Sequence, residues 1–330
     1  MGLVASITPA TDLTGWTPVR VSVAEGEPVI SWCWSDGEVF DPPFWNDTAN
    51  RLMRDPFRLL FQHTGGLGDL ERHEQRRPPL RPSGFVYHLS RCGSTFVTSA
   101  LASVPGVSVL SEPVPLDQLL RLVADQPTDR QALAARWMLS ALSPAADAGD
   151  DGLVVKLDSW HIHLFPILRR AYPDVPWIFL ARDPVEVMVS HDRQRGPQMI
   201  PGALPSELLR VDAETVSLHE HGASVLAAIL DSALFHEADG GLLVDYTELP
   251  EAITTRIQPH FGLAVIDPDP DVLSQHAKNP VLPFTPDGVE KRDGADPELR
   301  EATHRLVGGA YSAFDAARTR QLASDDEFPR

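Results

Sequence analysis

The segment FVYHLSRCGSTFVTSAL, residues 85–101, combines residue types that bind anions. A buried apolar run is followed by a short loop with one glycine, and a helix is expected to begin at Ser94 and Thr95. Loop amides and the first N–H groups of a helix lack an intrahelical partner, and the helix dipole favours negative charge at that end. Arg91 adds a fixed charge and the two hydroxyl groups add donors. The segment therefore predicts a phosphate-binding loop at residues 90–95.

This loop differs from the Walker A loop of nucleotide hydrolases, which reads G-x-x-x-x-G-K-[ST]. His88 stands at the position of the first glycine, and Ser94 stands at the position of the lysine. Hydrolysis of ATP or GTP with magnesium is therefore a poor fit to this segment.

A second anion-binding candidate lies in VPWIFLARDPVEVMVSHDRQ, residues 175–194. A buried strand is expected to end at Arg182, with Asp183 capping the next helix and Pro184 at its first position. Ser190 follows Arg182 by eight residues. Ligands of open parallel sheets bind at the carboxyl ends of the strands. Arg182 is therefore expected at a ligand-binding edge.

Together the two segments resemble the superfamily of sulfotransferases that use 3′-phosphoadenosine 5′-phosphosulfate (PAPS), including bacterial members. Residues 90–95 are similar to the 5′-phosphosulfate loop, P-[KR]-[ST]-G-[ST]-T, with arginine in the basic position as in tyrosylprotein sulfotransferases. Cys92 departs from the usual small hydroxyl residue. Arg182 and Ser190 are similar to the family's 3′-phosphate signature. The cofactor contacts that these motifs imply are Arg91, Cys92, Gly93, Ser94, Thr95, Phe96, Arg182 and Ser190.

The resemblance also implies catalytic groups. Glu112, in Ser-Glu-Pro after the run VSVL, stands where tyrosylprotein and several bacterial sulfotransferases have a glutamate that takes the acceptor's proton. The cytosolic branch uses a histidine after the next strand, which leaves Asp158, His161 and His163 as alternative bases. Lys156 is similar to a family lysine that stabilises the transferring group, and Arg91 completes the predicted catalytic set.

Two late segments add candidate cofactor contacts. The run LLVDYTEL is similar to a late strand of the family whose tyrosine lies near the adenine in some members, so Tyr246 is a candidate. Lys291 and Arg292 are expected in a basic loop over the 3′-phosphate. The His-x-His pairs at 161–163 and 219–221 would not share a helix face, and no metal site is expected.

Five short apolar runs are expected to form the strands that position these residues. They are 85–89, 107–110, 153–157, 177–181 and 242–246. Continuous hydrophobicity is typical of strands covered on both faces, and helical patterns lie between the runs. We therefore predict an α/β fold with a P-loop-like parallel sheet flanked by helices over residues 81–330. Residues 1–80 are expected to form a small α+β accessory subdomain. The polar stretch 65–84 is the predicted linker.

The net charge and composition limit the classes of partner that the protein is expected to bind. The net charge of −18 argues against nucleic acid and makes a polyanionic acceptor unfavourable. The two cysteines and the lack of an apolar run of about 18 residues predict a cytoplasmic protein without a membrane span.

These patterns predict transfer of a sulfuryl group from PAPS to a hydroxyl or amine of a small-molecule, lipid or peptide acceptor, releasing adenosine 3′,5′-bisphosphate. Two alternatives stay open, an ATP-dependent small-molecule kinase on a related P-loop fold and a non-catalytic nucleotide-binding module. The acceptor and the oligomeric state are not determined by the sequence.

Overall fold

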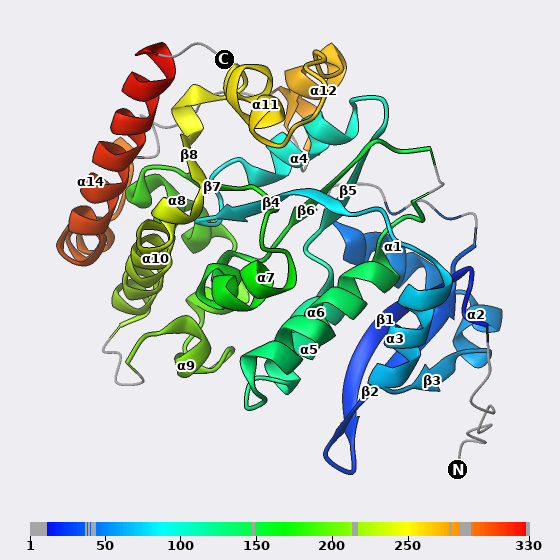
Figure 1. Ribbon diagram of the computed structural model, residues 1–330. Coiled ribbons are helices and arrows are strands. Elements are labelled where there is room, and N and C mark those ends of the chain that lie inside the picture. The colour runs from blue at the N-terminus through cyan, green and yellow to red at the C-terminus, as the bar shows by residue number, and fades with distance from the viewer. Residues whose placement is uncertain are drawn as a thin grey trace.

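A five-stranded parallel sheet forms the centre of the protein (Figure 1). The computed structural model describes residues 12–36, 38, 40, 44–146, 149–212, 217–276, 279–283 and 292–327. The sheet has the strand order β5-β6-β4-β7-β8. Its strands are β4 (Pro82–His88), β5 (Val107–Ser111), β6 (Gly152–Lys156), β7 (Trp177–Ala181) and β8 (Gly241–Asp245). The prediction of a parallel α/β sheet flanked by helices is confirmed, and its strands lie at the five apolar runs.

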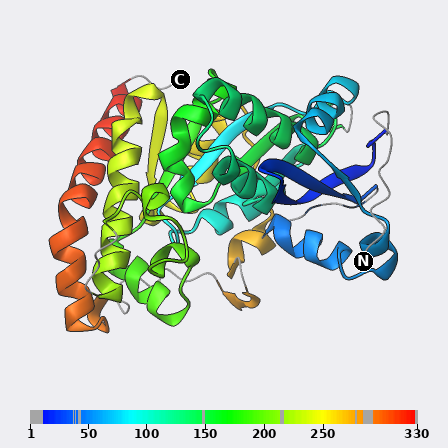
Figure 2. The same cartoon turned by 90° about the horizontal axis from the view of Figure 1, so that it is seen from below.

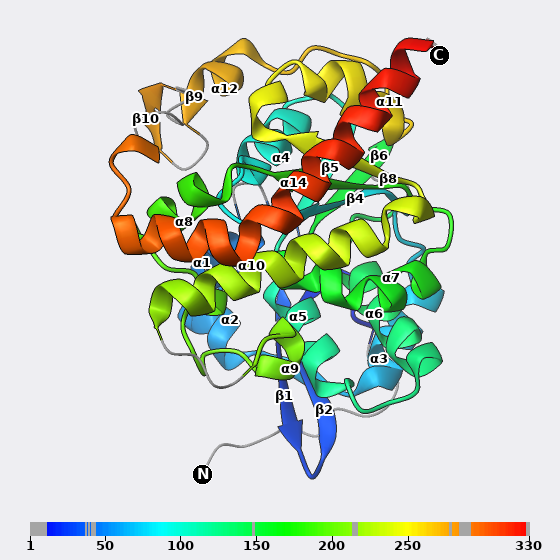
Figure 3. The same cartoon turned by 90° about the vertical axis from the view of Figure 1, so that its left-hand side faces the viewer.

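Helices cover both faces of the sheet (Figure 1). On one face lies α4 (Ser94–Ala102), with the π-helix Ile253–Ile257, α11 (Gln258–His260) and α12 (Pro270–Ser274). On the other face lie α5 (Val114–Leu122), α6 (Thr128–Leu142), α7 (Phe165–Ala171) and α10 (Leu218–Phe235). Helix α14 (Pro297–Glu327) packs along α10, as Figure 3 shows.

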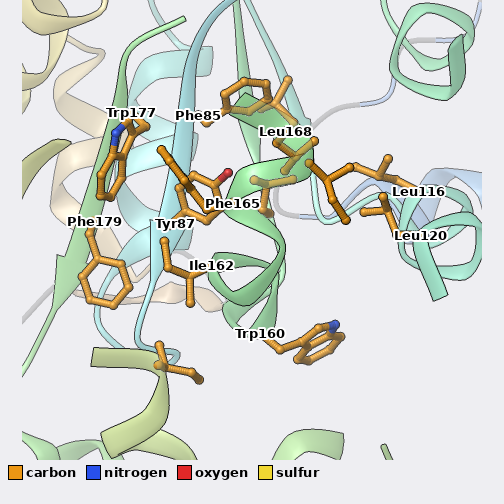
Figure 4. Packing of buried hydrophobic residues seen from close by; sticks show 14 of the residues in the cluster. Phe85, Tyr87, Leu116, Leu120, Trp160, Ile162, Phe165, Leu168, Trp177 and Phe179 are labelled. Atoms are coloured by element: carbon orange, nitrogen blue, oxygen red, sulfur yellow. The ribbon is translucent and has the colours of Figure 1, made fainter. Parts of the chain in front are cut away.

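Alternate residues of β4 enter the two cores because successive side chains of a strand point to opposite faces. Phe85 and Tyr87 pack with Phe165 and Trp177 in the larger core (Figure 4). Val86 enters the smaller core beneath α4. Both faces of such a strand are buried, so the side chains on both faces must be apolar. This explains why the apolar runs in the sequence do not alternate with polar residues.

The N-terminal elements form a separate small sheet. Strands β1 (Trp16–Ala24), β2 (Glu27–Trp34) and β3 (His63–Gly65) pair antiparallel in the order β1-β2-β3. Helices α1 (Trp45–Leu52), α2 (Pro56–Leu60) and α3 (Leu67–Arg76) accompany them. Figure 2 places these elements at the end of the molecule opposite α14. The expected small α+β unit is thus present.

This N-terminal sheet packs directly against α5 and α6, so it is not a separate unit joined only by a linker. The Val21 amide donates to Gln118 Oε1 at 2.7 Å, and Arg136 forms two hydrogen bonds with the Glu74 carboxylate at 3.1 and 3.0 Å. The linker predicted at 65–84 is wrong, because α3 and the start of β4 occupy it. Its polar residues belong to a helix that exposes one face. The boundary between residues 80 and 81 stays a prediction.

Short elements complete the described chain. They are α8 (Pro184–Arg193), α9 (Ser206–Leu209), β9 (Gln275–His276), β10 (Asn279–Pro283) and the 3₁₀ helices Ser159–Leu164, Pro197–Met199, Glu237–Asp239 and Tyr246–Glu248. Within the described part of the chain, no helix combines the length and the hydrophobicity that crossing a bilayer requires.

Candidate active site

The carboxyl ends of β4, β6 and β7 open into one cavity of about 460 Å³. This is the edge at which open parallel sheets bind ligands. Residues from both predicted anion-binding segments line the cavity, although the segments are about 90 positions apart in the sequence. The predicted site residues in its wall are Arg91, Gly93, Ser94, Thr95, Phe96, Glu112, Lys156, Arg182, Ser190 and Tyr246.

The loop between β4 and α4 has an unusual backbone. Ser90 has φ 72°, Arg91 has φ 50° and Gly93 has φ 86°, all in the left-handed region. Such turns aim successive backbone N–H groups at one point and form anion-binding concavities. Because α4 begins at Ser94, the N–H groups of its first turn point to the same place. The loop therefore has the geometry of a phosphate cradle.

The side chains of this loop diverge. Arg91 reaches the end of α8, where its guanidinium donates to the Gln194 backbone oxygen at 2.9 Å and to Gln194 Oε1 at 3.1 Å. Cys92 points into the core instead, with its thiol fully buried and 3.2 Å from the Leu180 carbonyl oxygen. Burial raises the pKa of this thiol to about 11. Cys92 is one of the predicted loop contacts, but it can offer an anion only its backbone N–H.

Lys156 and Glu112 meet at the floor of the cavity. Ser111 and Lys156 are paired in the parallel β5–β6 ladder, so Glu112 follows directly beside the lysine. Lys156 Nζ lies 2.7 Å from Glu112 Oε1 and donates to Thr95 Oγ1 at 3.1 Å. Burial opposes ionisation of Glu112, but Lys156 and the neighbouring His88 outweigh it and hold the pKa of the carboxyl well below its usual range. The floor of the cavity is thus an ion pair between a buried lysine and a partly exposed glutamate.

His88 supports this ion pair from the end of β4. Its Nδ1 accepts the Ser90 backbone N–H at 3.0 Å, which places the ring proton on Nε2. That nitrogen lies 3.3 Å from Glu112 Oε1. Burial lowers the pKa of His88, which favours the neutral ring beside the carboxylate.

The three alternative bases differ in whether their side chains line the cavity. Asp158 lines the cavity, and burial raises its pKa to about 7. His161 turns away, with its Nε2 3.1 Å from Asp117 Oδ1. His163 binds Ser232 in α10, with 2.8 Å between Nδ1 and the hydroxyl oxygen. Among these three, only Asp158 lines the cavity.

Asp117, Asp158 and His161 place one ligand atom each within 4.8 Å of one another. Asp117 is already engaged, because its Oδ1 accepts from Trp160 Nε1 at 2.8 Å and its Oδ2 pairs with Arg121 at 2.7 Å. This set is an internal hydrogen-bond network, and it carries no argument for a metal.

Arg182 emerges at the end of β7, as expected, and is held on two sides. Its Nε donates to Glu186 Oε2 at 2.6 Å, and its guanidinium carbon lies 4.0 Å above the centre of the Tyr246 ring. The Asp183 carboxylate caps α8 by accepting from the amides of Val185 and Glu186. The guanidinium is therefore fixed in the cavity wall, and Ser190 enters the wall from the same helix.

The predicted basic loop is only partly described. Lys291 lies outside the described residues. Arg292 pairs with Glu186 at 3.1 Å and with Asp183 at 3.5 Å, at the start of α8. It is not part of the cavity wall among the described residues. Arg292 thus lies beside the carboxylate that binds Arg182.

The wall also contains residues outside the predicted set, among them Phe44, Trp160, His191 and Gln198. Phe44, which precedes α1, places its ring centre 5.2 Å from Lys156 Nζ, and Trp160 follows β6. His191 and Gln198 lie near the loop at the end of α8. No local pattern in the sequence marks Phe44 or Gln198, because each reaches the cavity only through the tertiary fold.

No known protein-family model matches the sequence, and no curated protein matches it. The chain is similar to the solved sulfotransferase from Alicyclobacillus acidocaldarius, with 15% identity, coverage of 72% of this chain and 96% of that chain, and a TM-score of 0.43. It is also similar to the sulfotransferase domain from the curacin biosynthetic pathway, with 16% identity, coverage of 69% and 90%, and a TM-score of 0.37. Both are sulfotransferases, the family that the two motifs resemble. Likenesses at this level assign neither an activity nor a site residue to this chain.

Proposed function

We propose that this protein is a sulfotransferase that uses PAPS as the sulfuryl donor. The observation that carries the proposal is one cavity with two separate anion-binding places. The first is the start of α4 together with the preceding loop, Ser90 to Gly93, whose backbone enters the left-handed region. The second is the buried Arg182 with Ser190. A donor with phosphate groups at both its 5′ and 3′ ends needs two such places, whereas ATP needs only the first.

The residues present fit such a donor. The loop amides, Ser94 and Thr95 would bind the 5′-phosphosulfate. The Arg182 guanidinium carries several N–H donors in a fixed planar arrangement, and with the Ser190 hydroxyl it would bind the 3′-phosphate. Tyr246 lies between the two places, against both Arg182 and Gly93, where it would border the nucleoside.

In the proposed reaction the acceptor oxygen forms a bond to sulfur while the bond from sulfur to the phosphate oxygen breaks. Lys156 would stabilise the negative charge that develops on that leaving oxygen. As its ammonium turns to the phosphate, Glu112 loses its strongest partner and its pKa rises toward the usual range, which makes it a better base. Glu112 would then take the acceptor proton. Asp158 is the alternative base, since it also lines the cavity.

Calorimetry with three nucleotides tests the proposal. Adenosine 3′,5′-bisphosphate is expected to bind more tightly than ADP or ATP, without magnesium, because only the bisphosphate fills both places. Tighter binding of ATP with magnesium would overturn the proposal in favour of a kinase. Binding without transfer to any acceptor would leave a nucleotide-binding module.

The second place is tested with Arg182→Ala. This variant should weaken the bisphosphate at least tenfold more than adenosine 5′-phosphate, because it removes a charge-assisted contact to the 3′-phosphate alone. The ratio of the two affinities within one variant cancels any general loss of folding. Arg305→Ala, which breaks an ion pair with Glu220 on another face, is the matched control. Equal losses for both nucleotides would mean that Arg182 does not bind a 3′-phosphate.

A further inference from the structure

The segment that follows Ser190 folds back onto the anion-binding loop. His191 Nε2 lies 3.1 Å from Ser90 Oγ, and Gln198 Nε2 donates to the same oxygen at 3.2 Å. The Gly196 backbone N–H donates to His191 Nδ1 at 3.3 Å. Nδ1 is therefore the acceptor, and Nε2 carries the proton that His191 donates to Ser90. One hydroxyl of the loop thus receives two hydrogen bonds from a segment about 100 residues later.

The surrounding fold holds these two donors in place. Both side chains belong to residues that are only 3% exposed. His221 Nε2 donates to the Gln198 backbone oxygen at 3.1 Å. A Cβ atom at Gly196 would lie 2.4 Å from Gln198 Oε1, so the glycine leaves the space that this amide fills. The arrangement is buried and closely packed, unlike a chance surface contact.

The loop needs such support because its backbone is strained. Non-glycine residues in the left-handed region cost about 1–3 kcal/mol each and persist only where their surroundings hold them. Ser90 and Arg91 are two such residues in succession, with φ 72° and 50°. The motif that this loop resembles has proline at the position of Ser90, and a proline ring would hold φ near −65°. Here side-chain hydrogen bonds hold a conformation that proline cannot adopt.

We propose that His191 and Gln198 are positioning residues that hold Ser90 so that the loop amides converge on the 5′-phosphate group of the ligand. Helix α8 would then couple the two ends of the ligand. Ser190 contacts one end of the site, and its neighbour His191 acts through Ser90 on the other. This inference rests on the proposed function only for the nature of the 3′ end. The positioning of the loop applies to any 5′-phosphate ligand.

The test uses the full-length chain and three probes: adenosine 5′-phosphate, adenosine 3′-phosphate and the 3′,5′-bisphosphate. His191→Ala and Gln198→Ala should each weaken the 5′-phosphate and the bisphosphate on the order of tenfold, the loss expected for one hydrogen bond. Binding of the 3′-phosphate should change less than about twofold in both variants. Equal losses for all three probes, or no loss for the 5′-phosphate, would overturn the proposal.

Two further variants separate positioning from simple destabilisation. His191→Gln keeps an N–H donor and should restore much of the 5′-phosphate affinity that His191→Ala loses. Ser90→Ala combined with His191→Ala should lose no more than Ser90→Ala alone, because both changes break the same contact. Additive losses would contradict the shared role. His219→Ala is the matched control, since this histidine contacts Asp192 and should leave all three affinities unchanged.

The outcomes also distinguish this inference from the proposed function. If the bisphosphate binds no better than adenosine 5′-phosphate, the PAPS proposal fails. The loss of 5′-phosphate affinity in His191→Ala would still support the positioning role. If the bisphosphate is preferred but His191→Ala changes nothing, only the positioning role fails.

Discussion

Lys156 Nζ and Glu112 Oε1 lie 2.7 Å apart at the floor of the cavity, and the lysine side chain is only 1% exposed. The fold brings them together by pairing the last residues of β5 and β6 side by side. A buried ammonium needs a partner because its desolvation costs several kcal/mol. This pair therefore holds a cation at the floor of the cavity with its counter-charge in contact.

Removing the carboxylate should destabilise the protein. Glu112→Gln leaves the Lys156 ammonium buried without its counter-charge, and such losses are about 3–5 kcal/mol in free energy of unfolding. The double variant Glu112→Gln with Lys156→Met should recover most of that loss, since no buried charge remains. Urea unfolding at pH 7 measures both. If the double variant loses as much free energy of unfolding as the two single variants together, the ion pair is not the cause of these losses.

Asp158 predicts a pH dependence of stability. Burial raises its folded-state pKa to about 7, well above the ordinary aspartate value of 3.8. Its contribution to stability is therefore fully present below about pH 4 and is lost as the pH rises through 7. Asp158→Asn cannot ionise, so its stability relative to the wild type should rise between about pH 4 and 7, by at most about 1.4 kcal/mol per pH unit, and level off above pH 7. Urea unfolding of both proteins across this range provides the measurement, and parallel curves would contradict the raised pKa.

Gly93→Ala should damage ligand binding through Tyr246. The added Cβ would lie 2.9 Å from Tyr246 Cδ2, and that ring supports Arg182. We expect at least a tenfold loss of affinity for adenosine 3′,5′-bisphosphate, measured by calorimetry. Gly240→Ala is the control, because its φ of 83° matches the 86° of Gly93 while a Cβ there meets nothing within 4 Å. It should lose about 1–2 kcal/mol of stability and keep the affinity. Equal affinities in the two variants would contradict a role for the Tyr246 contact.

The Cys92 thiol should be inert and dispensable for binding. It is fully buried, and burial raises its pKa to about 11, so little thiolate exists at pH 8. A thiol reagent should react with neither cysteine of the native protein within minutes, and with both in urea. Cys92→Ala should keep its affinity for the bisphosphate within about threefold. Rapid labelling of Cys92 that the bisphosphate blocks would show that the side chain faces the cavity.

Local patterns were sufficient for the sheet and for the place of the anion-binding loop. Strands covered by helices on both faces must be apolar at every position, which makes runs such as 177–181 visible without any tertiary information. Asp183 and Pro184 mark the start of α8 by capping and by a fixed φ, and the helix begins there. The polar stretch 65–84 contains α3 instead of a linker, because the polar residues of a surface helix have the same composition as those of a linker.

The sequence by itself determined which strands form the core and which segments carry phosphate-binding residue types, because both depend on neighbours within a few positions. Only the tertiary structure decided which side chains meet. It turned Cys92 into the core, placed Asp158 but neither His161 nor His163 in the cavity wall, and brought His191 to Ser90 across 101 positions. The physical reason is that a contact between distant segments depends on strand order and on the direction of each side chain. Neither is encoded in the residues that flank the contact.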